Sequence, residues 1–308
     1  MELMGEIIKS TRTYMGMSQA DLADGICARE YIGKIERGQC TPSLDIIMEL
    51  SEKMNINLFD VYSNIYRSGD ISTYEKCNNI NNALNIHNIS HLSQLIEEYQ
   101  YLPGFSKGEP LKLLSYARSI ISARNGDYDE AKKIVLDAFS IKEDNLLDLL
   151  NSSKILSNTE YTLLLSYGAN LGRQGKADEA TQLFKAISSK LQIALNNYLP
   201  NTRHGRKDFF LNVWASCAYN LFLFSNEKAE ELIREIEKVL MFQKENRRTH
   251  MLVELTLALS YLLSKVGRKE EGIQMYKTAE SISYLYLNKG DFERFTTFIE
   301  KRIDTISL

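Results

Sequence analysis

Residues 18–38, with the sequence SQADLADGICAREYIGKIERG, decide how the first part of this 308-residue chain folds. Ser18, followed three residues later by Asp21, matches a capping box, in which each side chain accepts a hydrogen bond from the backbone N–H of the other residue. A short helix is therefore predicted to begin after Ser18 and to end near Gly25.

A second helix is predicted directly behind the first. Ile26-Cys27 is a tight connection, residues 28–37 form an amphipathic helix, and Gly38 suits the left-handed conformation that closes a helix. Within this helix, Ile32 and Ile35 are expected to point inward. Two short helices joined by a turn of a few residues form a helix-turn-helix.

Amphipathic segments flank this pair. Before it, four apolar residues are expected on or near one face of a helix that stops at Gly16: Leu3, Ile7, Ile8 and Met15. After it, Thr41-Pro42 is expected to start another helix, with Thr as the cap and Pro at the first position. The residues of that helix expected to face the core are Leu44, Ile47 and Leu50.

The outward side of the helix over residues 28–37 suits the major groove of DNA. Arg29 can donate two hydrogen bonds to guanine, and Glu30 can accept one from cytosine. Gln19, at the start of the preceding helix, lies where an amide can hold a phosphate. The predicted DNA-contacting residues are Gln19, Ala28, Arg29, Glu30, Tyr31, Lys34 and Arg37. Glu36 is instead expected to be an internal partner for a basic residue such as Arg12.

The net charge of this region opposes the DNA-binding interpretation. The first 66 residues contain six Lys and Arg but ten Asp and Glu, whereas a DNA-binding domain is usually basic. The interpretation therefore requires local complementarity, with one face shared by Lys9, Arg12, Arg29, Lys34 and Arg37. The alternative is a small helical bundle whose charges are only solvated.

The residues quoted above resemble a known family. Ser18-Gln19, Leu22-Ala23, the run from Lys34 to Gly38 and Pro42-Ser43-Leu44 stand at the spacings of the Xre/Cro-type helix-turn-helix. Arg29, Ile32 and Leu50 extend the match over roughly fifty positions. The turn Ile26-Cys27-Ala28 is one residue shorter than usual, which resembles the Rgg/PlcR branch of the RRNPP regulators.

The rest of the chain is predicted to be all-α. The whole sequence contains only 4 Pro and 16 Gly, and apolar spacings of three and four recur throughout. Arg67-Ser68-Gly69-Asp70 is the expected linker. The prediction is a DNA-binding domain over residues 1–66 and a repeat domain for peptide sensing and dimerisation over residues 67–308.

Similar polar turns recur in the second region. They are NGDYDEA at 125–131, QGKADEA at 174–180, SNEKA at 225–229 and VGRKEEG at 266–272. Ala131, Ala180 and Ala229 are spaced by 49 residues each time. This pattern indicates stacked helix hairpins, and Gly168, Ala180 and Phe184 stand at tetratricopeptide-like spacings. We therefore expect a right-handed α-solenoid of elongated tetratricopeptide-like hairpins, with another hairpin between residues 71 and 101.

A solenoid of this kind presents a concave surface that suits an extended peptide. Asparagine amides can pair with both the N–H and the C=O of a peptide, and arginine can hold a carboxylate. The predicted peptide-binding residues are Asn170, Arg173, Asn212, Tyr219 and Asn220. The alternative is that they are ordinary surface side chains. By contrast, four aromatic residues are expected in the core: Phe209, Phe210, Trp214 and Phe222.

Several classes of protein are not indicated. The four cysteines are scattered and the four histidines lack ligand spacing, so no metal site or cofactor is expected. No catalytic constellation stands out, and we predict that the protein is not an enzyme. Neither a signal peptide nor a membrane span is visible, so a cytoplasmic protein without a membrane partner is expected.

The resemblance to RRNPP regulators implies a function. It implies a quorum-sensing transcription regulator that binds double-stranded operator DNA as a homodimer and responds to a short signalling peptide. Two alternatives stay open: a ligand-independent, phage-type or toxin–antitoxin repressor, and a regulator whose repeats bind a protein partner.

Overall fold

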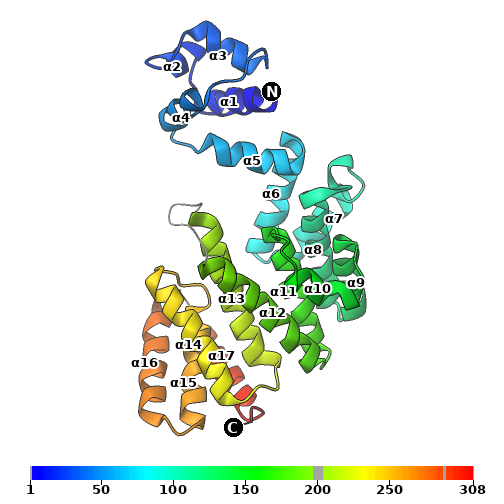
Figure 1. Ribbon diagram of the computed structural model, residues 1–308, viewed down its shortest axis with the longest axis vertical. Helices are drawn as coiled ribbons and strands as arrows, with labels where there is room; N and C mark the ends of the chain where they lie inside the picture. Colours follow the sequence, from blue (N-terminus) through cyan, green and yellow to red (C-terminus); the bar gives the residue numbers. More distant parts are fainter. Residues whose placement is uncertain (1, 197–203, 287–288, 308) are drawn as a thin grey trace. The chain divides into compact units, whose positions relative to one another are not determined.

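A computed structural model describes residues 2–196, 204–286 and 289–307. Within these ranges every regular element is helical, which confirms the predicted all-α class (Figure 1). The chain divides into two compact units, residues 1–117 and residues 118–308. Helix α8 (Gly108–Arg124) belongs to both, and each unit is described by itself.

Unit 1 starts with a bundle of five helices. The helices of unit 1 before α8 are α1 (Glu2–Tyr14), α2 (Gln19–Ala23), α3 (Arg29–Glu36), α4 (Leu44–Lys53), α5 (Leu58–Ser68), α6 (Ile71–Asn85) and α7 (Ile89–Tyr99), with a 3₁₀ turn at Pro103–Phe105. The first five helices share one apolar core that includes Ile7, Ile8, Leu22, Ile32 and Leu50. The predicted pair of short helices is confirmed as α2 and α3, and the predicted hairpin after residue 71 as α6 and α7.

Three details of the predicted flanks are wrong. Helix α4 begins at Leu44 rather than after Thr41-Pro42, because the Ser43 side chain accepts a hydrogen bond from Ile46 N and caps the helix. Leu44 is 61% exposed instead of facing the core, and Met15, on the opposite flank, is 42% exposed. Ile47 and Leu50, by contrast, are buried as expected.

The expected linker is a tight joint between two helices. Helix α5 continues to Ser68, so the expected boundary after residue 66 falls inside a helix. Gly69 ends α5 with a φ of 97°, and the Asp70 side chain then caps α6 by accepting from Thr73 N at 2.8 Å. The domain limits themselves stay a prediction.

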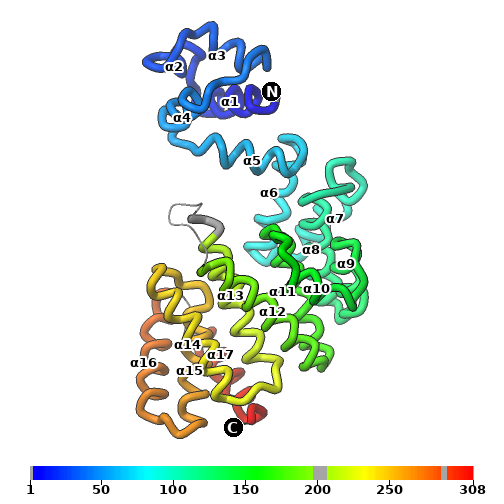
Figure 2. The backbone as a smooth tube through the Cα atoms, in the orientation of Figure 1, coloured from blue at the N-terminus to red at the C-terminus, as the bar shows by residue number. Residues whose placement is uncertain are grey.

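Unit 2 is a row of helix hairpins. It contains α9 (Tyr128–Phe139), a 3₁₀ turn at Glu143–Asn145, α10 (Leu146–Asn151), α11 (Asn158–Arg173), α12 (Ala177–Asn196), α13 (His204–Phe224), α14 (Ala229–Glu245), α15 (Leu252–Lys265), α16 (Lys269–Tyr286) and α17 (Lys289–Ile303). The chain runs along one helix and returns along the next (Figure 2). Since α11 packs against α13, and α13 against α15, the first helices of successive hairpins form one layer.

The predicted turns fall into two kinds. Gly126, Gly175 and Gly267 end their helices with φ values of 84°, 78° and 90°, in the left-handed region that favours glycine. The turn over residues 225–228 contains no glycine and follows a different path. Ala229 is accordingly the first residue of α14, although its sequence spacing suggested equivalence to Ala180, which is the fourth residue of α12.

The close approach of α11 and α12 at Gly168 gives a test of the hairpin packing. A Cβ atom at Gly168 would lie 2.7 Å from the Phe184 ring, so we expect Gly168→Ala to destabilise the protein by about 1–3 kcal/mol. Thermal unfolding would measure this loss. In a double-mutant cycle with Phe184→Leu, the smaller side chain should relieve part of it. Strict additivity of the two substitutions would contradict the predicted contact.

Candidate nucleic-acid interface and repeat surface

Helix α3 is held against α1 by a close backbone contact. A Cβ atom at Gly5 would lie 2.1 Å from the carbonyl oxygen of Ile35, so only glycine lets α1 approach α3 this closely. Ile32 and Ile35 are 0% and 1% exposed and anchor the inner face of α3 in the core. Gly5 could not be predicted from the sequence, because nothing near it in the chain indicates which backbone it meets.

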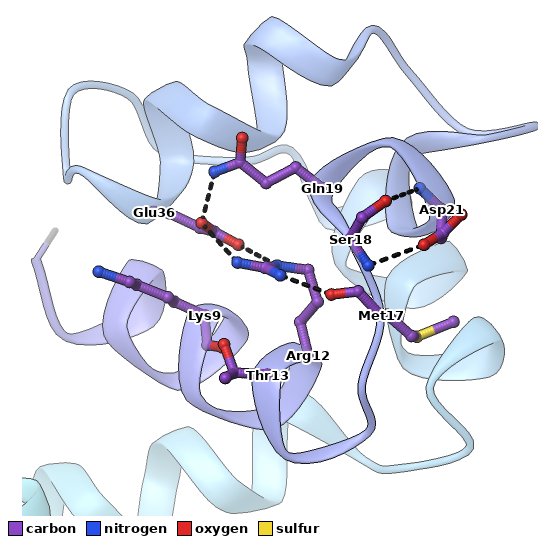
Figure 3. A network of polar contacts seen from close by, with 8 residues as sticks. All are labelled: Lys9, Arg12, Thr13, Met17, Ser18, Gln19, Asp21 and Glu36. Atoms are coloured by element: carbon purple, nitrogen blue, oxygen red, sulfur yellow. Dashed lines mark hydrogen bonds and ion pairs between the residues drawn. The ribbon is translucent and has the colours of Figure 1, made fainter.

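A buried ionic network fixes the end of α3. Glu36 accepts hydrogen bonds from Arg12 Nε at 2.6 Å and from Gln19 Nε2 at 2.7 Å (Figure 3). Arg12 also donates to the carbonyl oxygen of Met17 at 2.6 Å. The network therefore ties α1, α2 and α3 together, and it confirms the predicted structural role of Glu36 with Arg12.

The charge state of Glu36 follows from this network. Burial raises the pKa of the Glu36 carboxyl, but hydrogen bonds from Arg12 and Gln19 and the charges of Arg12 and Lys9 outweigh it. The pKa of Glu36 consequently lies below its ordinary value. The side chain of Arg12 is only 13% exposed and faces Glu36, so Arg12 does not belong to the exposed basic face that was expected.

The outward residues of α3 are open to solvent. Ala28, Arg29, Glu30, Lys34 and Arg37 are all exposed. Ala28 precedes the helix and its side chain makes no capping hydrogen bond, in contrast to the serine that caps α2. The first turn of α3 thus presents its side chains to solvent, and no capping side chain accepts from its first backbone N–H groups.

The other predicted DNA-contacting residues are partly engaged within the protein. Tyr31 is half-buried and packs against the core, and Gln19 is half-buried with its amide nitrogen bound to Glu36. Arg37 donates from Nε to Gln39 Oε1 at 3.2 Å. Gly33 leaves room for the Arg37 guanidinium, since a Cβ atom at Gly33 would lie 3.2 Å from its Nη1.

In unit 2, the two predicted residues on α11 form a small polar group. Asn170 is 0% exposed and its Oδ1 accepts from Arg173 Nη1 at 3.3 Å. Asn170 Nδ2 and Gln174 Oε1 are buried atoms that have no hydrogen-bond partner in the part of the chain that is described. Gln174 was not identified from the sequence, where it resembles an ordinary polar residue of a turn.

The three predicted residues on α13 differ in exposure. Asn212 and Asn220 are half-buried, and Asn220 Nδ2 donates to the carbonyl oxygen of Ser216 at 2.7 Å. Tyr219 is 8% exposed and stacks on Phe222, with ring centroids 6.2 Å apart. Burial and the negative charge of Glu254 raise the pKa of Tyr219 to about 12. Tyr219 is thus the most enclosed of the three.

The core aromatic residues of α13 lie largely as expected. Phe210, Trp214 and Phe222 are buried, whereas Phe209 is half-buried. Trp214 packs edge-on against Phe242 and donates from Nε1 to Glu235 Oε1 at 2.7 Å.

Two further observations on the described ranges concern metal ions and membranes. Those residues contain no group of three or more His, Cys, Asp or Glu side chains that could hold a metal ion. Among the described helices, none is long and apolar enough to cross a lipid bilayer.

The network around Glu36 predicts a pH-dependent loss of stability. Glu36→Gln removes the charge that faces Arg12 and should cost about 1–3 kcal/mol at pH 7. The pKa of Glu36 is lowered in the folded protein. The stabilisation by its charge is therefore present at pH values above its pKa in the unfolded chain, 4.5, and it disappears as the pH falls through its pKa in the folded protein.

Thermal unfolding of the full chain between pH 7 and pH 3.5, together with amide exchange over residues 29–37, would measure this loss. The control is Glu30→Gln on the exposed side of the same helix, which should change stability by less than about 0.5 kcal/mol. If the difference in stability between wild type and Glu36→Gln stayed constant over this pH range, this result would argue against the ionic role of Glu36.

Comparisons with known proteins agree with this geometry. Residues 8–61 match the helix-turn-helix family HTH_3. Among curated proteins, no sequence match was found.

Three solved structures share the fold over nearly the whole chain. PlcR of Bacillus thuringiensis, in complex with the peptide PapR7 and DNA, is 17% identical, with a TM-score of 0.64 over 99% of this chain and 100% of that one. ComR of S. thermophilus, in complex with DNA and its signalling peptide ComS, is 17% identical, with a TM-score of 0.56 over 98% and 99%. The pheromone receptor Rgg2 of Streptococcus dysgalactiae is 16% identical, with a TM-score of 0.51 over 97% and 99%. Residues 8–61 are thus an Xre-type helix-turn-helix domain, and the whole chain has the fold of the RRNPP regulators PlcR, ComR and Rgg2.

Proposed function

We propose that this protein is a cytoplasmic transcription regulator that binds operator DNA as a homodimer and responds to a short peptide bound by its helical repeats. The observation that carries the DNA half of this proposal is the exposed first turn of α3, held in place by the buried network around Glu36. A rigid helix with exposed Arg and Glu side chains at its N-terminal end suits the reading of base edges in a major groove.

The assignment of individual side chains to DNA follows from exposure. Arg29 and Glu30 lie in the first turn of α3 and are exposed, so they are proposed to contact bases. Lys34 and Arg37 are exposed further along and are proposed to contact phosphates. The proposed homodimer would place two such helices on a roughly palindromic operator, where the spacing of the half-sites must match that of the two helices.

The proposal that the repeats bind a peptide rests on two unbonded polar atoms at the C-terminal end of α11. Asn170 Nδ2 is a buried donor and Gln174 Oε1 a buried acceptor, one helical turn apart, and neither has a partner among the described residues. A peptide group carries the complementary pair, a C=O and an N–H. Since α11 packs directly on α13, which carries Asn212 and Asn220, an extended peptide could contact both helices. PlcR and ComR were each solved with DNA and a peptide, which supports the same two classes of partner here.

Two other functions remain as alternatives. A ligand-independent repressor would use the repeats only to dimerise, and a scaffold would use them to bind a protein. Calorimetry against a library of short peptides separates the first alternative from the proposal, and a pull-down with the full chain as bait tests the second.

For the DNA site, we expect Arg29→Ala to abolish specific binding while dimerisation persists. Losing one bidentate contact to guanine costs about 1–3 kcal/mol of discrimination between bases. Gel shifts at several salt concentrations, with a duplex selected by the wild type and with a scrambled duplex, would measure both affinity and salt dependence. Lys107→Ala is the control, because Lys107 is an exposed cation outside the predicted interface. Equal affinities of Arg29→Ala and wild type for the selected duplex would refute this role.

For the repeat surface, we expect Asn170→Ala to weaken peptide binding at least about tenfold, because it removes one hydrogen bond from a buried pair. Titration calorimetry with a peptide selected from the library would measure the affinity. Asn196→Ala, an exposed position at the end of α12, serves as the control. Equal affinities of Asn170→Ala and wild type would exclude α11 as the contact, whereas failure of the wild type to bind any peptide would favour the alternatives.

A further inference from the structure

The turn between α13 and α14 is closed differently from the other repeat turns. At Gly175 and Gly267, the helix end is closed locally: Lys176 N donates to Leu171 O at 3.0 Å, and Arg268 N donates to Leu263 O at 2.9 Å. No glycine is present over residues 225–228, so this way of satisfying the last carbonyl groups of α13 is missing.

Arg302, on α17, supplies the missing hydrogen bonds. Its Nε donates to the carbonyl oxygen of Phe222 at 2.7 Å, and its Nη2 donates to that of Ser225 at 2.6 Å. Phe222 and Ser225 are 0% and 2% exposed, so water cannot easily replace these bonds. The third nitrogen, Nη1, donates to Thr305 Oγ1 at 2.6 Å, which orients the guanidinium.

The tail behind α17 completes the closure on the other side of the turn. The carbonyl oxygen of Ser307 accepts from the backbone N–H of Ala229 at 3.0 Å, and Ala229 is 0% exposed. Ala229 is the first residue of α14, where a helix has N–H groups without partners of its own. The C-terminal tail and the turn lie side by side in Figure 1, where red meets yellow.

Hydrogen bonds from side chains of α15 hold α17 in this position. Lys265 Nζ donates to the carbonyl oxygen of Ile303 at 2.6 Å, and the Tyr261 hydroxyl donates to Glu300 Oε1 at 2.8 Å. Ile299, on the inner face of α17, is 0% exposed. The end of the chain is therefore bound to two hairpins at once.

We propose that residues 302–307 form a strap that locks the α13–α14 hairpin, so that release of the strap opens the turn between these two helices. Release would leave two buried carbonyl groups and one buried N–H without partners, and such groups are costly when unbonded. Any partner that moved α17 would thereby loosen α13. The inference concerns the conformation of unit 2 and holds whatever unit 2 binds.

Amide hydrogen exchange of the full chain tests the strap. In Arg302→Gln, the amides over residues 225–233 should exchange about tenfold to a hundredfold faster than in the wild type, because charge-assisted bonds that keep the turn closed are lost. Arg302→Lys keeps the charge but offers a single donor atom, so its acceleration should be smaller. Arg294→Gln is the control: Arg294 lies on the same helix, is 80% exposed and pairs with Asp291 at 3.1 Å, so residues 225–233 should exchange as in the wild type.

Fluorescence of Trp214, the only tryptophan in the chain, reports whether α13 still packs on α14 in each variant. Wild-type exchange over residues 225–233 in folded Arg302→Gln would overturn the proposal. Equal acceleration across α11–α16 would also overturn it, since Arg302 would then support the whole unit and not this turn. If Arg302→Gln does not fold, the comparison of Arg302→Lys with Arg294→Gln decides between the same outcomes.

Discussion

Polar backbone groups at helix ends must be hydrogen-bonded wherever they are buried, and a chain whose described elements are all helices meets this requirement at every turn. The protein satisfies it in three ways. Side chains cap the starts of helices, as Ser18 does for α2 and Ser157 for α11. Glycines in the left-handed region close most of the repeat turns. A distant arginine, Arg302, closes the turn over residues 225–228, which has neither device.

The N-terminal end of helix α3 is exposed and has no side-chain cap. Ala28 offers no side-chain oxygen, so the first N–H groups of α3 have no acceptor from a capping side chain. The opposite end of the same helix is the most tightly bound, through Glu36 and the contact of Ile35 with Gly5. This asymmetry is what a DNA-reading helix requires: a fixed base, and a free end that carries the positive pole of the helix dipole.

The sequence predicted those features that depend on short-range chemistry. The capping box of Ser18 and Asp21 and the left-handed Gly38 are decided by neighbouring residues, and the structure contains both. The pairing of Glu36 with Arg12 was also predictable, because a carboxylate on the inner side of an amphipathic helix needs a cation. Contacts set by the three-dimensional path were not predictable: Gly5 against Ile35, and Arg302 against a turn that lies 77 to 80 residues earlier. The equivalence of Ala229 and Ala180 that their spacing suggested is wrong for the same reason, since the first N–H of α14 is bound by Ser307, far along the chain.

The net charge of the first domain counts every carboxylate equally, although Glu36 is neutralised inside the protein. Glu36 is turned inward, with only 4% of its side chain exposed, and its charge is balanced by Arg12. The Ser18 side chain and the Ser18 backbone N–H both hydrogen-bond the Asp21 carboxylate, which directs it toward a helix end and lowers its pKa. The cations of α3, unlike Glu36, are exposed. A domain-wide sum counts these groups equally, but a DNA backbone interacts with the charges on the surface that it approaches, because solvent screens the others within about 10 Å. The position of each charge therefore decides whether this domain can accept DNA, and the proposed face keeps Arg29, Lys34 and Arg37 on the side open to it.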